Sequence, residues 1–408
     1  MTFPSVPLSE VCGRISSGGT PSRKRPDYFA EIDGHPWVKS QELVDASIHA
    51  TSEHISDLGL ANSSAKYYPP DTILLAMYGA NVGQLGLLRI RATVNQAICG
   101  LCIDPSAANS RYVFYSLLQE RKRLVGQAAG AAQQNLNQDL IRNFRVPLPP
   151  LSLQHKIAAI LSTYDDLIEN NNRRIKILEE LAQRIYREWF VDFRYPGHEN
   201  GSLVDSELGL MPDGWKVLSF AELGEYVNGY AFKPGDWSRE GLPIVKIREL
   251  KNGVSAETPL YFGDLGAKYA IRDGDLLFSW SAHLDAYLWT GGPAWLNQHL
   301  FRVDPSASVP TAFLFHALKE RMGEFRSRSQ GTTMRHIKRS ALNQVTVVVP
   351  PDATRNAFAA LVAPVDDMAL ALVRATRNLR DTRDLLLPRL VSGKVDVEGL
   401  DIAMPEAA

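Results

Sequence analysis

The sequence is poor in cysteine and has no excess of charge of either sign. Its three cysteines, Cys12, Cys99 and Cys102, are too few for a disulfide framework in a chain of 408 residues, which fits a reducing compartment. The 44 Lys and Arg residues against 45 Asp and Glu residues give a net charge of −1. This balance excludes a uniformly basic nucleic-acid clamp, so any bound polyanion must meet a local basic cluster.

Long apolar runs are missing as well. The first residues, MTFPSVPLSE, lack the charged and apolar regions of a signal peptide, and no apolar run approaches the roughly 20 residues that span a bilayer. We therefore expect a cytoplasmic protein. With 22% charged and 45% hydrophobic residues, the composition is that of a soluble globular protein. The length predicts two to three domains.

What the sequence does contain is an internal repeat with an offset of about 200 residues. The pair Asn95-Gln96 returns as Asn297-Gln298. The stretch YVFYSLLQER returns 200 residues later as AFLFHALKER, and KIAAILSTYDDL returns 201 residues later as AFAALVAPVDDM. The sequence therefore predicts two similar halves that differ by small insertions in loops.

Each half divides into a mixed region and a long helix. The mixed regions alternate short apolar runs with Gly and Pro turns, which predicts two globular mixed α/β (α+β) domains. Leu153 to Phe190 contains neither Gly nor Pro, and its apolar positions step by four and three residues, as in a heptad seam. The predicted division is 1–150 for the first domain, 151–193 for a long helix, 194–213 for a linker, 214–351 for the second domain, 352–395 for a second long helix and 396–408 for a tail.

The two helices are expected to pack against each other in antiparallel fashion and to act as a spacer, with two independent helical hairpin caps as the alternative. Thirty-eight residues span about 57 Å at 1.5 Å per residue, which exceeds the width of an ordinary domain. Pro364 is expected to kink the second helix or to restart it. The predicted seam and partner-docking positions are Ile157, Leu161, Ile168, Asn171, Ile175, Leu178, Ile185, Trp189, Phe190, Leu372, Leu379, Leu386 and Leu390.

Basic residues gather at one matching place in each half. Between Arg111 and Arg145 there are six Lys and Arg against two acidic residues, and between Lys319 and Arg339 there are seven against two. Such clusters neutralise phosphates, although a solvated helix face is the plain alternative for either cluster alone. Because the cluster recurs in both halves, we favour duplex DNA as the ligand.

Two loop segments are the predicted DNA contacts in each half. The first is SGGTPSRKR at Ser17, matched by VNGYAFKPG at Val227, and the second is GAAQQNLNQ at Gly130, matched by GTTMRHIKR at Gly331. Amides can pair with adenine edges and Arg or Lys with guanine, although an ordinary surface loop is an open alternative for both pairs and an equally good one for the first. The hypothesised contacts are Thr20, Ser22, Arg23, Lys24, Lys39, Tyr78, Arg121, Arg123, Gln133, Gln134, Asn135, Asn137, Lys233, Lys246, Arg326, Arg328, Thr332, Thr333, Arg335, His336 and Lys338.

Recognisable catalytic motifs are absent from the sequence. No P-loop, zinc-protease, nucleophile-elbow or dinucleotide-binding pattern occurs. The most nuclease-like pattern, Asp236 with Glu249-Leu250-Lys251, has Val44 in place of the lysine in the first half, so its glutamate is predicted to serve a strand end. Cys99 and Cys102 lie in an apolar run without a second pair, which favours burial over zinc binding. We expect no catalytic residues, no metal and no cofactor bound by this chain.

Several longer motifs are spread over nearly the whole chain. They are GGTPS, the repeated NQ pair, VPLPPLSLQHKIAAIL, DDLIENNNRRIKILEELAQRIYREWFVDF, GLMPDGW and LLLPRLVSGKVDV. In these motifs the sequence resembles the specificity subunit of type I restriction-modification enzymes.

The resemblance implies a non-catalytic subunit with two target-recognition domains, each of which reads one half of a split DNA site. It implies that the two helices set the spacing between the half-sites and bind two methyltransferase subunits. It also implies that motor-nuclease subunits complete the complex. S-adenosylmethionine, ATP and Mg²⁺ would belong to those partners. Two alternatives stay open: a nuclease or methyltransferase component of a stand-alone or fused system, and a protein scaffold that reads no sequence.

Overall fold

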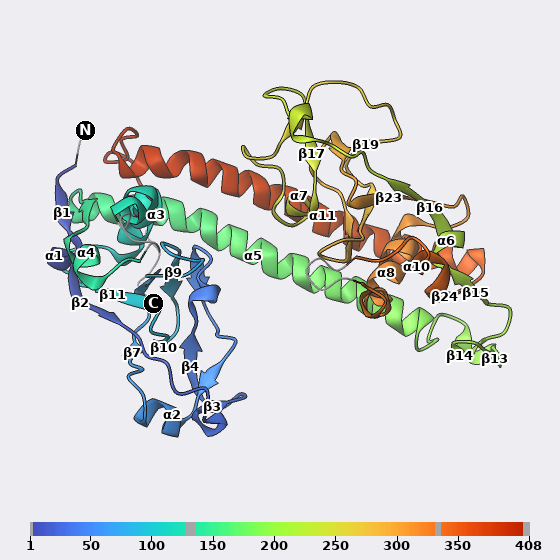
Figure 1. Cartoon of the computed structure of the whole chain (residues 1–408), viewed down its shortest axis with the longest axis horizontal. Coiled ribbons are helices and arrows are strands. Elements are labelled where there is room, and N and C mark those ends of the chain that lie inside the picture. Colours follow the sequence, from blue (N-terminus) through green and yellow to red (C-terminus); the bar gives the residue numbers. More distant parts are fainter. Residues whose placement is uncertain (1–2, 128–134, 331–335, 403–408) are drawn as a thin grey trace. The chain divides into compact units, whose positions relative to one another are not determined.

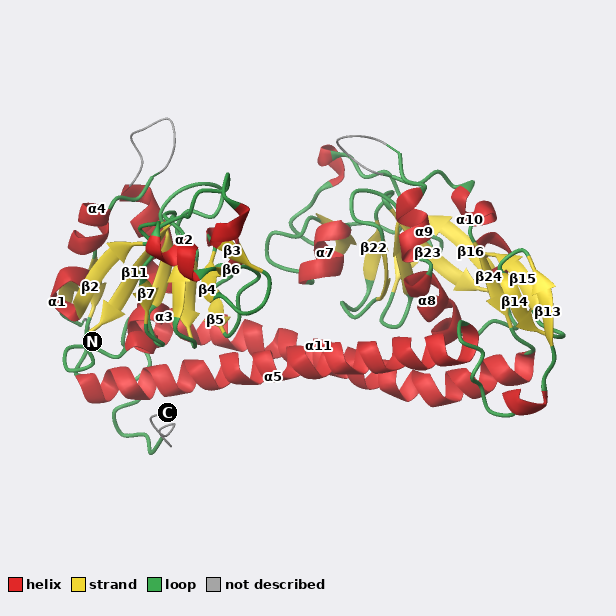
Figure 2. Ribbon diagram, turned by 90° about the horizontal axis from the view of Figure 1, so that it is seen from below, coloured by secondary structure: helices red, strands yellow, loops and turns green. Residues whose placement is uncertain are grey.

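A computed structural model describes residues 3–127, 135–330 and 336–402 of the chain (Figure 1). These residues form two compact units. The first comprises residues 1–168 and 379–408, and the second comprises residues 169–378. The division passes through both long helices, so each unit contains one mixed α/β region and one part of each helix (Figure 2).

The mixed region of the first unit is built from three small sheets. Their strand orders are β1-β12, β2-β11-β8-β9-β5 and β3-β6-β4-β10-β7. The elements are β1 (Ser5–Pro7), α1 (Leu8–Val11), β2 (Cys12–Ser17), η1 (Pro26–Tyr28), β3 (Phe29–Ala30), β4 (His35–Val38), η2 (Ser40–Glu42), β5 (Ala46–Ile48), β6 (His54–Ile55), α2 (Asp57–Ala61), β7 (Tyr67–Tyr68), β8 (Ile73–Ala76), β9 (Leu85–Leu88), β10 (Ala92–Val94), β11 (Ile98–Ile103), α3 (Ser110–Gln127), α4 (Gln138–Asn143) and β12 (Arg145–Pro147).

The mixed region of the second unit repeats this plan. Its strand orders are β15-β24, β16-β23-β20-β21 and β18-β17-β22-β19. The elements are β15 (Lys216–Ser219), α6 (Phe220–Leu223), β16 (Gly224–Asn228), η4 (Pro234–Asp236), β17 (Leu242–Val245), α7 (Ile247–Asn252), β18 (Leu260–Tyr261), β19 (Ala270–Ile271), β20 (Leu276–Ser279), β21 (Asp285–Leu288), β22 (Ala294–Leu296), β23 (Leu300–Pro305), α8 (Thr311–Glu320), α9 (Met322–Ser327), α10 (Ala341–Gln344) and β24 (Thr346–Val349).

The repeated topology confirms the predicted pair of mixed α/β domains. In both units the first strand pairs with the last one in antiparallel fashion, β1 with β12 and β15 with β24. Both units also share a parallel pair at the same place in an otherwise antiparallel sheet, β4 with β10 and β17 with β22. The first unit has a further parallel pair, β5 with β9, in its other five-stranded sheet. The strand pairing therefore shows the internal repeat more clearly than the weak sequence similarity of the two halves does.

The long helices are α5 (Leu151–Phe190) and α11 (Asp352–Val391), each of 40 residues. Within the first unit, Ile157 and Leu161 near the beginning of α5 share a core with Leu390 near the end of α11. Within the second unit, Phe190 at the end of α5 packs on Phe358 near the beginning of α11, with ring centroids 4.9 Å apart. In each unit, therefore, the two helix segments run antiparallel.

Three details differ from the prediction. The helix α11 continues through Pro364 without a restart, and the proline lies exposed on its surface. The helices end at Phe190 and Val391, earlier than the predicted 193 and 395. The predicted linker 194–213 contains the short helix η3 (His198–Asn200) and a hairpin of β13 (Leu203–Ser206) and β14 (Gly209–Pro212), which folds this segment locally.

One stretch of α11 has the length and composition of a membrane span. In the second unit the helix nevertheless packs as part of a globular core, since Phe358 and Val362 are fully buried there. The same helix carries Asp366, which is paired with a buried histidine. Part of its apolar surface is therefore covered by the protein, while Leu361 and Met368 stay exposed.

Candidate nucleic-acid interface

A glycine turn follows the second strand in the first unit. The Gly18 amide donates to the Ile98 carbonyl at 3.1 Å, and the Gly19 amide donates to the Val94 carbonyl at 3.0 Å. A Cβ on Gly18 would collide with the Val94 carbonyl, so only glycine permits this close approach. After the turn Thr20 is half-buried and Pro21 is buried, while the residues from Ser22 to Arg25 are exposed.

The second unit forms the same turn with different side chains. The Gly229 amide donates to the Leu300 carbonyl at 3.1 Å, and the Tyr230 amide donates to the Leu296 carbonyl at 2.8 Å. A Cβ on Gly229 would collide with the Asn297 carbonyl. The scaffold of the loop is therefore conserved between the two halves, while the residues that follow it are not.

The repeated Asn-Gln pair lies next to this turn. The Asn95 amide donates to the Val38 carbonyl at 2.9 Å, and the Asn297 amide donates to the Val245 carbonyl at 3.1 Å. These hydrogen bonds extend the parallel pairs β4–β10 and β17–β22 by one residue beyond the strands. Gln96 lies exposed and accepts a hydrogen bond from the Thr20 hydroxyl.

In both units a buried aliphatic side chain anchors the second predicted segment to the mixed region. Leu136 is buried, and its amide donates to the Met77 carbonyl at 2.7 Å. Ile337 is buried in the second unit, and its amide donates to the Trp280 carbonyl at 3.0 Å. Both carbonyls belong to the residue that follows the equivalent strands β8 and β20, so the two segments are anchored in the same way.

In the first unit the two segments touch each other. The Gln138 side-chain amide donates to the Ser17 hydroxyl at 2.9 Å, across 121 residues of sequence. Asn135 is exposed beside this contact, and the Asn137 side-chain oxygen accepts from the Leu140 amide at 2.8 Å, which caps α4. The structure thus brings the two predicted segments together on one surface.

Several predicted basic contacts of the first unit are held by acidic neighbours. Arg23 and Lys39 share the Glu53 carboxylate at 2.7 and 2.6 Å, and Arg121 pairs with Asp45 at 2.5 Å. The hydrogen bond from Lys39 lowers the pKa of Glu53, which keeps it ionised. Arg123 pairs with Glu120 and lies over the Phe144 ring, whereas Ser22 and Lys24 are exposed and Tyr78 is half-buried against the core.

The predicted contacts of the second unit are similarly divided. The Lys233 amide donates to the Asp236 carboxylate at 2.7 Å, and the Lys246 ammonium lies 4.7 Å from the centre of the Trp237 ring. Arg328 pairs with Glu324 at 2.9 Å. Of the remaining positions, Arg326 donates to the Leu284 carbonyl, His336 is half-buried in a bridge to Ser281, and Lys338 is exposed. Gln133, Gln134, Thr332, Thr333 and Arg335 lie outside the described residues.

Four residues of this surface are not among the individually predicted contacts, although Gln138 and Arg339 end two of the predicted segments. Gln96 and Gln138 bond across it, and Arg142 and Arg339 donate to the equivalent carbonyls of Ile15 and Tyr226 at 2.8 and 3.0 Å. The recurrence of the Asn-Gln pair was a usable signal for Gln96. The two arginines occupy unaligned positions, so no sequence signal marks their common role.

The nuclease-like pattern has a structural explanation. The Glu249 side chain is buried and accepts from the Lys246 amide at 3.0 Å, and Glu42 accepts from the Lys39 amide at the same distance. Both glutamates therefore cap the short helix that follows a strand, as expected. Cys99 is fully buried, and burial raises its pKa to about 12, which keeps it a thiol. Among the described residues no group of three His, Cys, Asp or Glu side chains could hold a metal ion.

Comparison with known proteins identifies the family. The family described as "Type I restriction modification DNA specificity domain" matches residues 2–180 and again residues 212–379. The chain belongs to this family. The two matches coincide with the two halves of the repeat, and the family is that of the specificity subunit, which is non-catalytic.

Individual relatives agree with this assignment. The MjaIX specificity subunit of Methanocaldococcus jannaschii is 25% identical over 95% of this chain and 92% of its own length. The MjaVIII specificity subunit of the same organism is 24% identical over 92% of both chains. The crystal structure of the S subunit from M. genitalium, at 15% identity, shares the fold with a TM-score of 0.60 over 95% of this chain and 96% of that one.

Two predicted docking positions on the long helices of this specificity-family chain were wrong. Phe190 is only 3% exposed and packs on Phe313 and Phe358 in the core of the second unit, and Trp189 is partly buried against the same core. Neither residue forms an outer apolar face. The prediction was wrong because the second mixed region itself covers this side of α5.

The other seam positions lie where the two helices meet within each unit. Ile157, Leu161, Ile168, Asn171 and Leu390 are buried, and the remaining ones, Ile175, Leu178, Ile185, Leu372, Leu379 and Leu386, are partly buried. The exposed apolar side chains of the helices are different residues. They include Leu167, Ile177 and Leu181 on α5 and Leu361, Met368 and Leu385 on α11.

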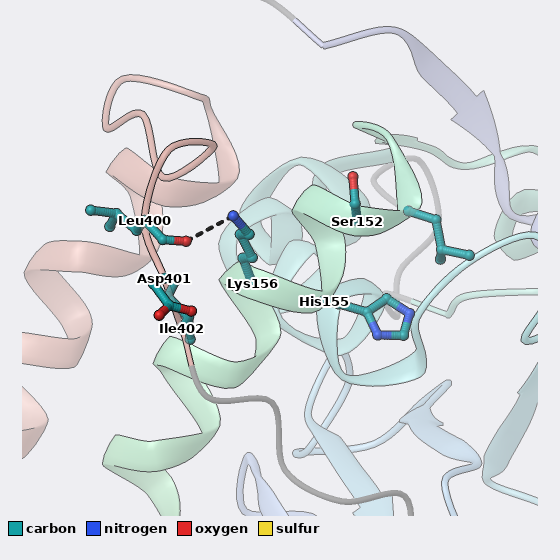
Figure 3. A pocket seen from close by; sticks show the side chains of 7 residues that line it. Ser152, His155, Lys156, Leu400, Asp401 and Ile402 are labelled. Carbon is teal, nitrogen blue, oxygen red and sulfur yellow. Dashed lines mark hydrogen bonds between the residues drawn. The ribbon is translucent and has the colours of Figure 1, made fainter.

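A pocket in the first unit lies away from the two loops. Figure 3 shows it between Ser152, His155 and Lys156 near the beginning of α5 and the segment after α11. The Lys156 ammonium donates to the carbonyls of Glu398 and Leu400 at 2.6 and 2.8 Å. These contacts fasten the C-terminal segment onto α5, so the pocket belongs to the helix junction and not to the candidate interface.

Replacing Gly18 with alanine is expected to destabilise the first unit, because the added Cβ would collide with the Val94 carbonyl. Overpacking of this kind costs about 1–3 kcal/mol of unfolding free energy. Gly13 in β2 is the matched control, since a Cβ there has no heavy atom within 4 Å. Denaturant unfolding of both variants measures the difference, and equal stability of G18A and G13A would contradict the described turn.

Proposed function

We propose that each mixed α/β region reads one half of a split DNA site and that the two long helices set the distance between the halves. The observation that supports this most strongly is the repeated interface. Each unit presents a glycine turn and an anchored polar segment on the same scaffold, but Thr20 and Gln138 of the first unit are replaced by Ala231 and Arg339 in the second. A conserved frame with different side chains suits two different half-sites.

Selection from a library of random duplexes tests this proposal on the full chain. The expected result is enrichment of duplexes that share two short sequences separated by a fixed number of unspecified base pairs. A single uninterrupted motif would contradict the proposal of two reading domains, and the absence of any enriched sequence would favour a scaffold that reads no sequence.

The partners that we propose are methyltransferase subunits and motor-nuclease subunits. The methyltransferase subunits would dock on the helices at the exposed apolar side chains, such as Leu167 on α5 and the repeat-related Met368 on α11. S-adenosylmethionine, ATP and Mg²⁺ would be bound by these partners. We further propose that the complex acts in the cytoplasm, where its DNA substrate is found.

Replacing Lys338 with alanine is expected to weaken DNA binding uniformly across sequences. Lys338 is exposed directly after the buried anchor Ile337, so its charge is available to a phosphate. The loss of one phosphate contact lowers the slope of log K against log salt by about 0.9. Titrations at several salt concentrations measure the slope, with Lys216→Ala on the exposed face of β15 as the control. An unchanged slope in K338A would remove this residue from the interface.

A further inference from the structure

Two aspartates related by the repeat lie where each mixed region meets the long helices. Asp165 on α5 and Asp366 on α11 occupy the same position of the repeat, 201 residues apart. Each one binds a side chain from the long helix of the adjacent mixed region, α3 or α8. Each is followed by a second, exposed aspartate, Asp166 or Asp367.

In the first unit the junction joins three helices. The Tyr115 hydroxyl of α3 donates to Asp165 Oδ2 at 2.5 Å, and Arg383 of α11 donates to Asp165 Oδ1 at 2.6 Å. Tyr115 is 3% exposed, and burial together with the Asp165 carboxylate raises its pKa well above its ordinary value. This contact therefore keeps its protonation state over the whole neutral range.

In the second unit the same three-helix junction uses a histidine. His316 of α8 is 2% exposed and places Nε2 at 3.1 Å from both carboxylate oxygens of Asp366 on α11. Its Nδ1 lies 3.1 Å from Gln183 Oε1 on α5. The donor to the aspartate is thus a tyrosine hydroxyl in one unit and an imidazole in the other.

The hydrogen bonds of Gln183 orient this histidine. The Gln183 amide nitrogen donates to Glu320 Oε2 at 2.9 Å and to the His316 carbonyl at 3.4 Å, so its oxygen faces His316 Nδ1. The two ring nitrogens therefore face hydrogen-bond acceptors from different helices, Gln183 Oε1 on α5 and the Asp366 carboxylate on α11. His316 thus links α8 to both long helices.

We propose that Asp165 and Asp366 are positioning residues that hold each mixed region at a fixed orientation on its segment of the long helices. A tyrosine hydroxyl and an arginine make the contact with Asp165, and a buried histidine makes the contact with Asp366. This inference goes beyond the proposed function and rests on it only for its effect on DNA reading.

Charged groups from α5, α8 and β21 also lie around His316. They are Glu179 and Arg187 of α5, Lys319 and Glu320 of α8, and Asp285 of β21. Lys319 is paired with Asp285 and Arg187 with Glu320, which leaves Asp366 as the carboxylate in direct contact with the ring. Asp366 is therefore the group whose replacement breaks this contact.

Hydrogen exchange of the full chain tests the two contacts without reference to DNA. Asp366→Asn is expected to speed exchange in α8 by about tenfold or more, as expected when a buried pair loses its charge, and to leave α3 unchanged. Asp165→Asn should do the reverse. The matched controls Asp367→Asn and Asp166→Asn change the neighbouring exposed carboxylates and should alter neither helix. Equal effects of D366N and D367N would overturn the proposal.

Binding to duplexes with one altered half-site connects the contacts to recognition. D366N is expected to lower discrimination at one half-site only and D165N at the other. If the wild-type chain reads no split site, the proposed function fails while the exchange experiments still decide the role of the aspartates. If it does read one and both variants discriminate normally, the positioning role is refuted.

Discussion

Removing seven residues from each long helix is expected to bring the two half-sites closer by about three base pairs and to leave their sequences unchanged. The deleted segments are Asn172–Leu178 in α5 and Leu370–Thr376 in α11. Seven residues of helix span about 10 Å at 1.5 Å each. Because base pairs are stacked about 3.4 Å apart, this length corresponds to about three of them.

The choice of segments follows from the helix register. Asp165 faces Arg383 in the first unit and Phe190 faces Phe358 in the second, and the two residue numbers in each pair add to the same total, 548. The deleted segments face each other in this register, and a deletion of seven residues preserves the heptad phase on both sides. The deletion also leaves Arg377 in place, which bonds to the Thr290 carbonyl at 2.9 Å.

Duplex selection with the shortened chain measures the spacing. A control that lacks only Asn172–Leu178 shifts one helix against the other by two turns and should lose stability without a defined new spacing. Altered half-site sequences with an unchanged spacing would contradict the role of the helices as a spacer.

Replacing Phe190 with alanine is expected to lower the unfolding free energy of the second unit by about 3–5 kcal/mol. The ring is surrounded by Tyr186, Trp215, Phe313 and Phe358, with centroid distances from 4.9 to 5.9 Å. A cavity would remain because these rings belong to α5, α8, α11 and Trp215, the residue before β15. These four segments cannot all move into the space that the ring leaves. Thermal or denaturant unfolding of the full chain measures the loss.

Ile177→Ala provides the comparison on the same helix, since Ile177 is 62% exposed. It should change stability by a few tenths of a kcal/mol at most, in line with other surface substitutions. If F190A instead retained its stability and lost binding to methyltransferase subunits, Phe190 would be a docking residue after all.

The contrast between Phe190 and Ile157 shows how far the sequence predicts the helices. Steps of four and three residues identify the stripe on which Ile157 and Leu161 pack against α11, because both helices carry the pattern locally. Phe190 is buried by a third element, the mixed region that includes Phe313, and this element is 123 residues away in the sequence. A heptad pattern describes the contact of two helices and carries no information about a third.

The candidate interface was predictable to a similar extent. The repeat of glycine turn and polar segment located the two loops in each half, and the structure brings them together through Gln138 and Ser17. The count of basic residues overstated the free charge, because Arg121, Arg123 and Arg328 are paired with acidic side chains. The partner of Arg121, Asp45, lies 76 residues away and outside the counted stretch, so no local sum of charges could include it.

Sequencing of methylated bases in cells that express this chain together with its methyltransferase subunit tests the central claim most directly. We predict one split motif, with two specified half-sites at a fixed spacing and a methylated base in each half. The motif should disappear when the gene for this chain is deleted. Methylation at a single uninterrupted motif, or a split motif that persists without this chain, would contradict the account.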